Sequence, residues 1–550
     1  MSSIRSLSLR NLAAAWLWSH RVAAATWSVG VGAIMVTFAY SFRGMVADFA
    51  GGAAGFATAA QATADAMRPI SGPAFRLDTY AGYVTYHNVG IWSLLLAVYA
   101  SIQGGLALRG LEERGVLQLF VASSSRLRVM TARVVAFTSA MAMIAVGTGV
   151  GMGIGLVAAG EPGWASGFVL AAEVTLTACV FYALALVVAQ LTRSARAAAG
   201  TVSAFAIASY LISNTYDQLG PAAGLRFVSP FFYLLQSRFV MVSGHSADLI
   251  ATAVLLVALI APIVLAWRLF AGRDIDAVAV RLPFSIPKSD WTLRRRRASV
   301  RSLWIYFLRD QWLSLAAWVG GVFVLEFVYL AIFPQVRDVW ETSDIVKVLI
   351  SMAGGETLLA GYLSFMLGFV AIVAAAFSVV QAGRWLGDHA AGRDELYVAG
   401  APVSRLRLSL ERWLALVVGL VIISMGAVAG LVAGAATAGE TPEVGGVVRT
   451  AADVVLIGVA VGGVSAALAI WLRSGLALGI LGALLALSYL LTVLRPLFKW
   501  PEWTAHISVF DAFGYPYTGV PAPLGLAVLA VLAIGGAVVA GTVAVRRSAV

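Results

Sequence analysis

The residue types that carry out chemistry in enzymes are sparse in this chain of 550 residues. One cysteine, Cys179, and five scattered histidines exclude a disulfide framework and a thiolate metal site. A P-loop needs a lysine directly after a glycine, but Lys288, Lys347 and Lys499 all follow other residues. Serine-nucleophile and zinc-helix motifs do not occur either. The chain therefore cannot hydrolyse a nucleotide through a P-loop, and a pump built on it must draw its energy from another chain or from an ion gradient.

Three acidic residues within or beside apolar runs are the remaining candidates for chemistry. Glu173 and Asp453 fall near the ends of their runs, where a carboxylate costs little free energy and an end cap or an ion pair explains it. Glu326 falls deeper in its run. It is interpreted either as a site of proton coupling or as a polar contact in a substrate cavity.

A polar, charged segment interrupts the apolar sequence twice, at residues 112–126 and at residues 392–405. Both copies contain Gly-x-x-(Gln/Glu)-Leu-aromatic-Val-Ala, followed by Ser-Arg. Exposed charges beside apolar residues predict a short helix at the membrane boundary, although a loop that only anchors the topology is the alternative. Two matched protrusions suit a two-fold partner, so we expect them to couple the chain to a motor subunit. The candidate coupling residues are Glu112, Glu113, Arg114, Gly115, Gln118, Arg126, Asp388, Gly392, Arg393, Glu395 and Arg405.

The elements that position these segments are expected to span a membrane. Hydrophobic residues make up 60% of the chain and charged residues 12%, with a mean hydropathy of +0.89. A soluble protein has about 25% charged residues, so lipid is the expected solvent for most of this surface. Most of the 38 Lys and Arg residues fall on one side of the expected spans. The positive-inside rule then places the amino terminus in the cytosol and explains the net charge of +11 without nucleic acid.

Apolar windows near 20 residues recur along the chain and predict an all-α polytopic membrane protein with about twelve transmembrane helices. The expected spans are residues 22–40, 88–108, 134–158, 168–191, 200–213, 249–270, 312–333, 361–381, 413–436, 451–472, 476–491 and 523–545. Residues 1–20 are expected to form a separate amphipathic helix on the cytosolic face. Residues 227–235 are expected to form a partly buried or re-entrant hairpin on the other side.

The second half of the sequence repeats the first. In nearly one register, residues 81–83 return as 360–362, residues 147, 151 and 155 as 426, 430 and 434, residues 171–174 as 451–454, residues 193–194 as 473–474, and residues 209–211 as 488–490. A six-helix unit is therefore duplicated, and an even number of spans makes the two repeats parallel. We expect a first repeat at residues 1–275, a basic cytosolic linker at 276–300 and a second repeat at 301–550. The four-spaced glycines of the third and ninth spans predict close helix packing.

A transport pathway is expected between the two repeats, and aromatic residues of the first, second and fifth spans and their counterparts are candidates to line it. For any one of them, a lipid-facing or interfacial position is the simpler explanation. The pathway candidates are Trp27, Phe38, Tyr86, Trp92, Tyr99, Phe205, Tyr210, Phe323, Glu326, Phe327, Phe365, Phe369 and Tyr489.

The second polar segment, which ends in Ala-Pro-Val-Ser-Arg at residues 401–405, resembles the corresponding segment of type-2 ABC exporter permeases. So do Arg-Asp-Ile at residues 273–275 and Ser-Pro-Phe at residues 229–231. The fused twelve-span form is similar to the tetronasin-type antibiotic exporter permeases of actinobacteria and to mycobacterial multidrug efflux permeases. Residues 123–126, Ser-Ser-Ser-Arg, depart from the pattern, so the first segment is expected to be shorter or to dock differently.

The resemblance implies two copies of a separate ATP-binding subunit beneath this chain, with ATP and Mg held there and no cofactor on the chain itself. Closure of these subunits would push coupling helices around residues 115–126 and 392–405, with interfacial elbow helices at residues 1–20 and 300–311. The repeats would then move a hydrophobic drug-like compound outward across the bacterial plasma membrane, with both termini in the cytosol. The competing hypotheses are a proton-coupled exporter that acts alone and a membrane enzyme that acts on lipid.

Overall fold

The computed structural model describes residues 8–48, 51–66, 68–192, 194–218, 220–275, 277–279, 302–334, 337, 357–390, 392–400, 403–471, 479–482, 484–485, 487–489, 491–492, 495, 501–519 and 522–546. Nearly all of these residues are helical, and none of them lies in a β-strand. Ten of the described helices are long and apolar enough to cross a membrane. The predicted all-α polytopic membrane protein is thus confirmed. The chain divides into two compact units, Met1–Ser285 and Ile286–Val550.

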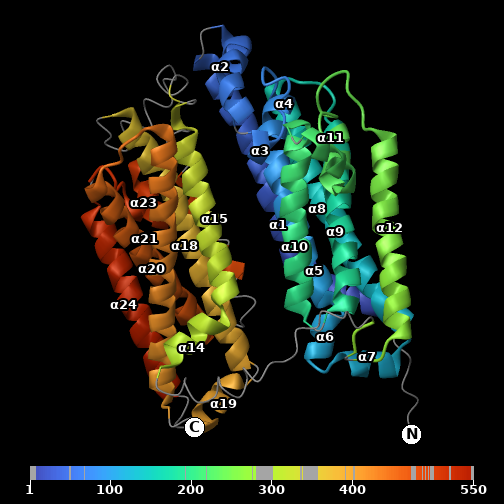
Figure 1. Ribbon diagram of the computed structural model, residues 1–550, viewed down its shortest axis with the longest axis vertical. Coiled ribbons are helices and arrows are strands. Elements are labelled where there is room, and N and C mark those ends of the chain that lie inside the picture. The colour runs from blue at the N-terminus through green and yellow to red at the C-terminus, as the bar shows by residue number, and fades with distance from the viewer. Residues whose placement is uncertain are drawn as a thin grey trace. The chain divides into compact units, whose positions relative to one another are not determined.

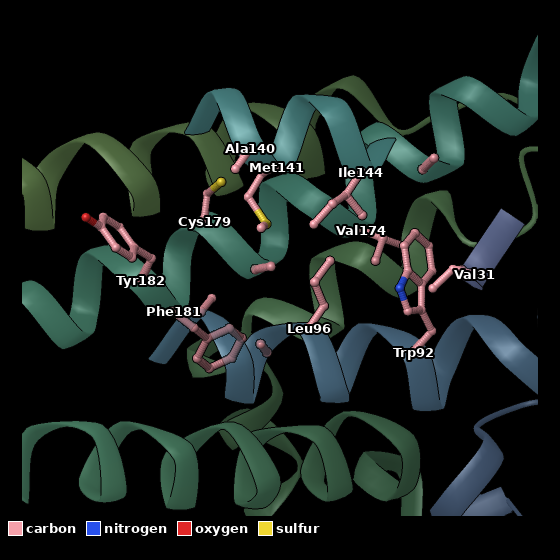
Figure 2. Packing of buried hydrophobic residues seen from close by; sticks show 14 of the residues in the cluster. Val31, Trp92, Leu96, Ala140, Met141, Ile144, Val174, Cys179, Phe181 and Tyr182 are labelled. Atoms are coloured by element: carbon pink, nitrogen blue, oxygen red, sulfur yellow. The ribbon is translucent and has the colours of Figure 1, made fainter. Parts of the chain in front are cut away.

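In the first unit, long helices run side by side, with short helices at both ends (Figure 1). The long helices are α1 (Leu9–Asp48), α5 (Gly90–Ala107), α8 (Arg126–Ala159), α9 (Ser166–Leu191), α10 (Ala195–Thr215) and α12 (Leu249–Gly272). Helix α9 packs against α5, α8 and α12, while α1 packs along α8 and α10 along α5. Figure 2 shows part of the resulting core, to which α1, α5, α8 and α9 contribute Val31, Trp92, Ile144 and Val174.

The second unit repeats these pairings. Its long helices are α15 (Trp312–Ala331), α18 (Leu358–Ala390), α20 (Arg405–Ala438), α21 (Val444–Trp471) and α24 (Pro523–Arg546). Helix α15 packs along α20 as α1 does along α8, and α21 contacts α18, α20 and α24 as α9 contacts α5, α8 and α12. A shorter apolar helix at Gly479–Tyr489, described only in part, follows α21 as α10 follows α9. Helix order and helix partners therefore recur from one unit to the other.

Glycines make the same helix crossing possible in both units. A Cβ atom added at Gly151 of α8 would lie 2.5 Å from the Cα atom of Gly32 on α1. One added at Gly430 of α20 would collide with the carbonyl group of Phe323 on α15. Because any larger residue would force the helix axes apart, the packing role predicted for the four-spaced glycines is confirmed. The crossings also show that Gly32 and Phe323 occupy equivalent places.

The amino-terminal helix differs from the expectation. Helix α1 runs without a break from Leu9 to Asp48, so no separate interfacial helix precedes the span within the described residues. Alanines favour a helix here, and neither glycine nor proline occurs between Leu9 and Ser28. In the second unit, by contrast, α14 (Leu303–Asp310) is separated from α15 by Gln311 and is a distinct helix, as expected for an elbow helix.

Short elements cover the two ends of the first unit (Figure 1). They are α2 (Gly52–Ala66), α3 (Arg68–Ser71), α4 (Tyr80–Val84), the 3-10 helix η3 (Gly220–Val228) and α11 (Pro230–Ser237) at one end, and α6 (Arg109–Glu113) and α7 (Leu117–Ser123) at the other. The hairpin predicted at residues 227–235 is the end of η3 followed by α11, whose Phe231 is buried. Of the predicted linker at residues 276–300, the structure describes only residues 277–279. Arg193 and residues 401–402 also lie outside the described residues.

A π-helix, η1 (Thr85–Val89), joins α4 to α5. A π-turn disturbs the regular hydrogen-bond ladder, so its carbonyl groups need other partners. Arg238, which is only 2% exposed, supplies a partner to two of them: its Nη2 donates to the carbonyl oxygens of Thr85 at 2.9 Å and Tyr86 at 3.3 Å. The same atom donates to the carbonyl oxygen of Ser71, on α3, at 2.5 Å. One buried guanidinium thus fixes the irregular part of the second span.

Candidate functional site

The first polar segment folds into α6 and α7 at one end of the first unit (Figure 1). Gly115, between the two helices, has a φ of +69°, in the left-handed region that favours glycine. After α7, the Oγ of Ser125 accepts the backbone N–H of Arg128 at 3.3 Å and caps the start of α8. Helix α7 is therefore bounded by a glycine turn on one side and a serine cap on the other.

The second polar segment has the same construction. Helix α19 (Arg393–Gly400) follows Gly392, whose φ is +67°. The Oγ of Ser404 accepts the backbone N–H of Arg407 at 3.2 Å and caps α20. Each unit thus carries one short helix between two long ones, as the shared sequence pattern predicted.

Each short helix presents an exposed leucine. Leu119 on α7 is 68% exposed and Leu396 on α19 is 72% exposed, and both occupy the same place in the shared pattern. The residues that precede them, Gln118 and Glu395, are also on the surface. Neither leucine belonged to the predicted coupling set, although the repeated Gly-x-x-(Gln/Glu)-Leu pattern contained both. Both units thus present the same apolar group at the same place on the short helix.

An aromatic pair attaches each short helix to its unit. Trp16 of α1 and Phe120 of α7 meet edge to face, with ring centroids 5.5 Å apart. Phe307 of α14 and Tyr397 of α19 meet in the same way at 5.8 Å. Trp16 precedes Gly32 by as many residues as Phe307 precedes Phe323, so the two aromatic pairs are equivalent. Burial raises the pKa of the Tyr397 hydroxyl, which therefore stays protonated.

An arginine lies over the ring of each pair. The Cζ atom of Arg133 is 4.0 Å from the ring centroid of Trp16, and that of Arg412 is 5.6 Å from the ring centroid of Phe307. The two arginines occupy the same position of the repeat, on α8 and α20. They were not predicted as site residues, although both occur at the main offset of the repeat.

Glu112 is buried rather than exposed, in contrast to the prediction. Its carboxylate forms ion pairs with Arg109 and, at 2.5 Å, with the Nη2 of Arg273, and all three side chains are almost fully buried. The Nε of Arg273 also donates to the Oε1 of Gln190 at 2.8 Å, at the end of α9. Residues from α6, α9 and the chain after α12 are thus tied together, so Glu112 serves the internal structure of the unit.

Two further residues of the predicted coupling set are also engaged inside the first unit. The Oε1 of Glu113 accepts the backbone N–H of Ala195 at 2.8 Å, at the start of α10. The Nη1 of Arg126 donates to the carbonyl oxygens of Phe270 at 3.1 Å and Arg273 at 2.5 Å. Of the predicted residues in this segment, Glu113, Arg114, Gly115 and Gln118 are exposed.

Carboxylates play a different part in the second unit. The Nη2 of Arg412 lies 2.7 Å from Asp394 and 3.5 Å from Asp388, and all three side chains are largely buried. Arg393 pairs with Asp388 at 3.0 Å on the outside of this cluster. The polar segment of the second unit therefore supplies counter-ions to its own buried arginine.

Arg405 aligns with Arg126 in the shared pattern but makes a different contact. Its Nη2 donates to both carboxylate oxygens of Glu395, at 2.7 and 2.9 Å. Glu395 is mostly exposed, and such a surface pair contributes about 0–1 kcal/mol to stability. Glu395 is therefore free to exchange this partner for another at little cost.

The aromatic pathway candidates of the first unit pack largely against rings of their own unit. Ring centroids lie 5.8 Å apart for Trp27 and Tyr99, 5.8 Å for Phe38 and Tyr83, 6.0 Å for Phe205 and Phe181, and 5.2 Å for Tyr210 and Phe231. Tyr86, Trp92 and Tyr210 are buried, while Trp27, Phe38, Tyr99 and Phe205 are half-buried. The half-buried rings remain candidates for the pathway.

The candidates of the second unit form two groups. Phe323 and Phe327 stack along α15, and Phe369 lies within 6.2 Å of the rings of Phe365 and Tyr489. All five are half-buried.

Glu326 lies on α15 and is buried. Its Oε1 has no hydrogen-bond partner among the described residues. When the two units are aligned through Gly32 and Phe323, Glu326 aligns with Met35, so its counterpart in the first unit is apolar. The sequence correctly indicated an acid without a symmetric partner, and its role stays a prediction.

Fold and site together define a multi-pass α-helical membrane protein in which each unit carries a short surface helix between two spans. Residues 304–546, almost the whole second unit, match the family described as "Multidrug efflux system permease Rv1217c, C-terminal domain". This match confirms the resemblance to mycobacterial multidrug efflux permeases and supports a permease role in drug efflux. A comparison with curated proteins gave no match.

Proposed function

We propose that this chain is the membrane subunit of an ATP-driven exporter of the ABC type, which moves hydrophobic drug-like compounds outward. Two copies of a separate ATP-binding subunit hold ATP and Mg and supply the energy, and the chain itself carries no cofactor. The observation that carries this proposal is the matched pair of short helices, α7 and α19, each with a left-handed glycine before it and an exposed leucine on it. A permease without a P-loop needs such a surface to receive mechanical work.

In the proposed topology, α7 and α19 face the cytosol of a bacterial plasma membrane, and both termini lie on the same side. The asymmetric distribution of Lys and Arg along the sequence supports this orientation. The substrate pathway lies between the units and includes half-buried aromatic residues of α1, α5 and α15. Closure of the ATP-binding subunits shifts the population between two arrangements of the units by several kcal/mol of differential ATP binding.

The two short helices pass a push to the spans by different routes. In the first unit, α7 contacts Trp16, which belongs to α1 itself, so a displacement of α7 acts directly on the continuous helix. In the second unit, α19 contacts Phe307 of α14, which is separated from α15 at Gln311. Two identical ATP-binding subunits would therefore act on short helices that are attached to their spans in different ways.

The test is to replace each exposed leucine by aspartate. Burying a leucine in an interface contributes about 1.5–3 kcal/mol, so Leu119→Asp or Leu396→Asp should weaken docking of the ATP-binding subunit by roughly 10- to 150-fold. The matched control is Leu249→Asp, at an exposed leucine at the opposite end of the first unit. Co-purification of the ATP-binding subunit and drug efflux are the readouts, and access to buried Cys179 reports the fold.

Each single variant should lose part of the co-purifying subunit, and the Leu119→Asp/Leu396→Asp double variant should lose it and lose efflux. In all of them Cys179 should stay protected from thiol reagents. A double variant that retains both the subunit and efflux would rule out α7 and α19 as the docking sites. Efflux by the purified chain without any ATP-binding subunit would rule out ATP-driven transport altogether.

A proton-coupled exporter that acts alone is the second candidate, and Glu326 is the observation that favours it. A buried carboxylate without a hydrogen-bond partner on one oxygen is a recognised feature of proton relays. Under this alternative, Glu326→Gln abolishes proton-driven efflux in vesicles that contain only this chain. Unchanged ATP-driven efflux by Glu326→Gln would eliminate the alternative.

A further inference from the structure

A cavity of about 150 Å³ lies in the first unit, between α1, α5, α8 and α9 and beside α6. The residues that give it its chemistry are Trp16, His20, Gln103, Arg114, Arg133 and Tyr182. Two of these are arginines, and no carboxylate lines the cavity. The cavity therefore has a net positive lining without an internal counter-ion.

Arg133 is the residue that most needs an anion. It lies over the ring of Trp16, but its Nε is buried and has no hydrogen-bond partner among the described residues, where no ion pair to it occurs either. The nearest acids in the sequence are used elsewhere: Glu112 pairs with two other arginines, and Glu113 caps α10. Arg133 as a whole is half-buried, and a guanidinium that has lost part of its water without gaining a charged partner is costly.

The equivalent arginine of the second unit has the anion that Arg133 lacks. Arg412 lies over Phe307 as Arg133 lies over Trp16, and it pairs with Asp394 at 2.7 Å and Asp388 at 3.5 Å. The two units therefore share the arginine and the ring but differ in the counter-ion.

The surroundings of the two arginines can be aligned through a pair of glutamines. Gln103 of α5 lies 3.3 Å from the Nε2 of His20, and Gln381 of α18 donates to the Oε1 of Gln311 at 2.5 Å. His20 precedes Gly32 by as many residues as Gln311 precedes Phe323, so these two partners are also equivalent. Gln103 and Gln381 are thus equivalent residues at the same corner of each unit.

This alignment shows which side chain of the second unit has no counterpart in the first. Gly110 lines the cavity. The spacing from Gln103 to Gly110 equals the spacing from Gln381 to Asp388, so Gly110 and Asp388 are equivalent positions. Where the second unit places Asp388, the more distant of the two carboxylates beside Arg412, the first unit has no side chain, and Leu117 stands at the place of Asp394. The cavity therefore lies at the position where the first unit lacks the counterpart of Asp388.

We propose that this cavity binds the phosphate group of an anionic ligand as the counter-ion of Arg133. The guanidinium presents a planar fork of donors that matches phosphate oxygens, and Arg114 adds a second cation at the same cavity. Gln103 and His20 offer neutral hydrogen bonds to the remaining oxygens.

The volume decides the class of ligand. A water molecule takes up about 30 Å³ of liquid, so the cavity holds the equivalent of roughly five waters. Drug-sized ligands occupy about 300–1,000 Å³, so the cavity takes a phosphate group but not a drug. Leu106 lines the cavity and is 37% exposed, which gives acyl chains a path along the surface of α5. A phospholipid headgroup and a free phosphate ion are the two sources of this group.

The experiment uses the full chain, stripped of lipid in a neutral detergent. Three additions are compared: phosphatidylglycerol, the diacylglycerol with the same acyl chains, and sodium phosphate against sodium chloride at equal ionic strength. The readouts are the number of phosphatidylglycerol molecules retained in native mass spectrometry and the rate at which Cys179 reacts with a maleimide. Cys179 lies one helical turn before Tyr182, so its reactivity reports on this part of α9.

Three variants identify the site. Arg133→Gln removes the guanidinium and should weaken phosphate-dependent protection roughly tenfold or more. Arg128→Gln, the matched control, removes an exposed arginine from the same helix outside the cavity and should behave as the unchanged chain. Gly110→Asp supplies the counterpart of Asp388, one of the two carboxylates beside Arg412, and should protect Cys179 without any addition while abolishing the response to phosphate.

Protection by phosphatidylglycerol but not by diacylglycerol or phosphate supports the proposal with a lipid headgroup as the source. Equal protection by sodium phosphate supports it with the free ion as the source. Protection by phosphatidylglycerol and by phosphate that is equal in the unchanged chain and in Arg133→Gln would overturn it, as would protection by diacylglycerol alone. Gly110→Asp keeps the test decisive if Arg133→Gln does not fold. The outcome is independent of whether ATP drives transport.

Discussion

Replacement of Glu112 by glutamine gives the most direct test of the buried ion network. Glu112 is the one acid between Arg109 and Arg273, and the three side chains are almost fully buried. Removal of one partner from a buried ion pair costs about 3–5 kcal/mol, because the remaining charge stays buried without compensation. In Glu112→Gln two arginines lose their partner at once, so we expect a loss within this range or above it.

The assay follows from the single cysteine. Cys179 is buried on α9, the helix whose end holds the side chain of Arg273, so maleimide labelling requires the first unit to open. With a factor of ten for every 1.4 kcal/mol, a loss of about 3–5 kcal/mol raises the labelling rate roughly 100- to 4,000-fold when reclosing is faster than labelling.

Two further variants make this measurement specific. Glu395→Gln removes an acid from an exposed pair and should change stability by about 0–1 kcal/mol. A variant with apolar residues at positions 109, 112 and 273 should recover much of the loss, because no charge is then left buried. Labelling of Glu112→Gln at the rate of the unchanged chain would show that this network does not hold the unit together.

Three other predictions test separate features. Gly32→Ala should destabilise the α1–α8 crossing by about 1–3 kcal/mol and speed Cys179 labelling, because its Cβ would lie 2.8 Å from a backbone oxygen. Gly30→Ala, whose Cβ would meet open space, should have neither effect. Equal effects of the two substitutions would contradict the crossing. Glu326→Gln should leave thermal unfolding, followed by tryptophan fluorescence, unchanged or shifted upward, and a drop would reveal an ion partner. Arg238→Met should increase hydrogen exchange across η1, because several carbonyl groups lose their donor at about 1–3 kcal/mol each; unchanged exchange would show that η1 does not need the guanidinium.

Much of the fold could be predicted because its signals are local. Apolar windows marked the long helices, and four-spaced glycines marked the crossings between them. The short helices were found because Gly115 and Gly392 begin a pattern that occurs twice in the sequence. Helix α1 was divided wrongly, since a polar first part suggested an interfacial helix while the backbone propensity of its alanines favoured continuity.

The less predictable part of the site depends on contacts between distant residues. The burial of Glu112 requires Arg273, which comes far later in the chain and was noted only as part of the Arg-Asp-Ile motif at residues 273–275. The equivalence of Trp16 and Phe307 was hidden because the first span keeps a different register from the rest of the repeat. Local patterns carry neither kind of information.

The left-handed glycines have a consequence for the entropy of association. Because Gly115 and Gly392 set the chain direction through their own backbone angles, the start of each short helix is fixed before anything binds to it. Ser125 and Ser404 fix the other end in the same local way. A partner that contacts these helices finds them already ordered, so little of its binding free energy is lost to ordering the backbone. Substitution of either glycine would raise that entropic cost even where no contact with the partner changes.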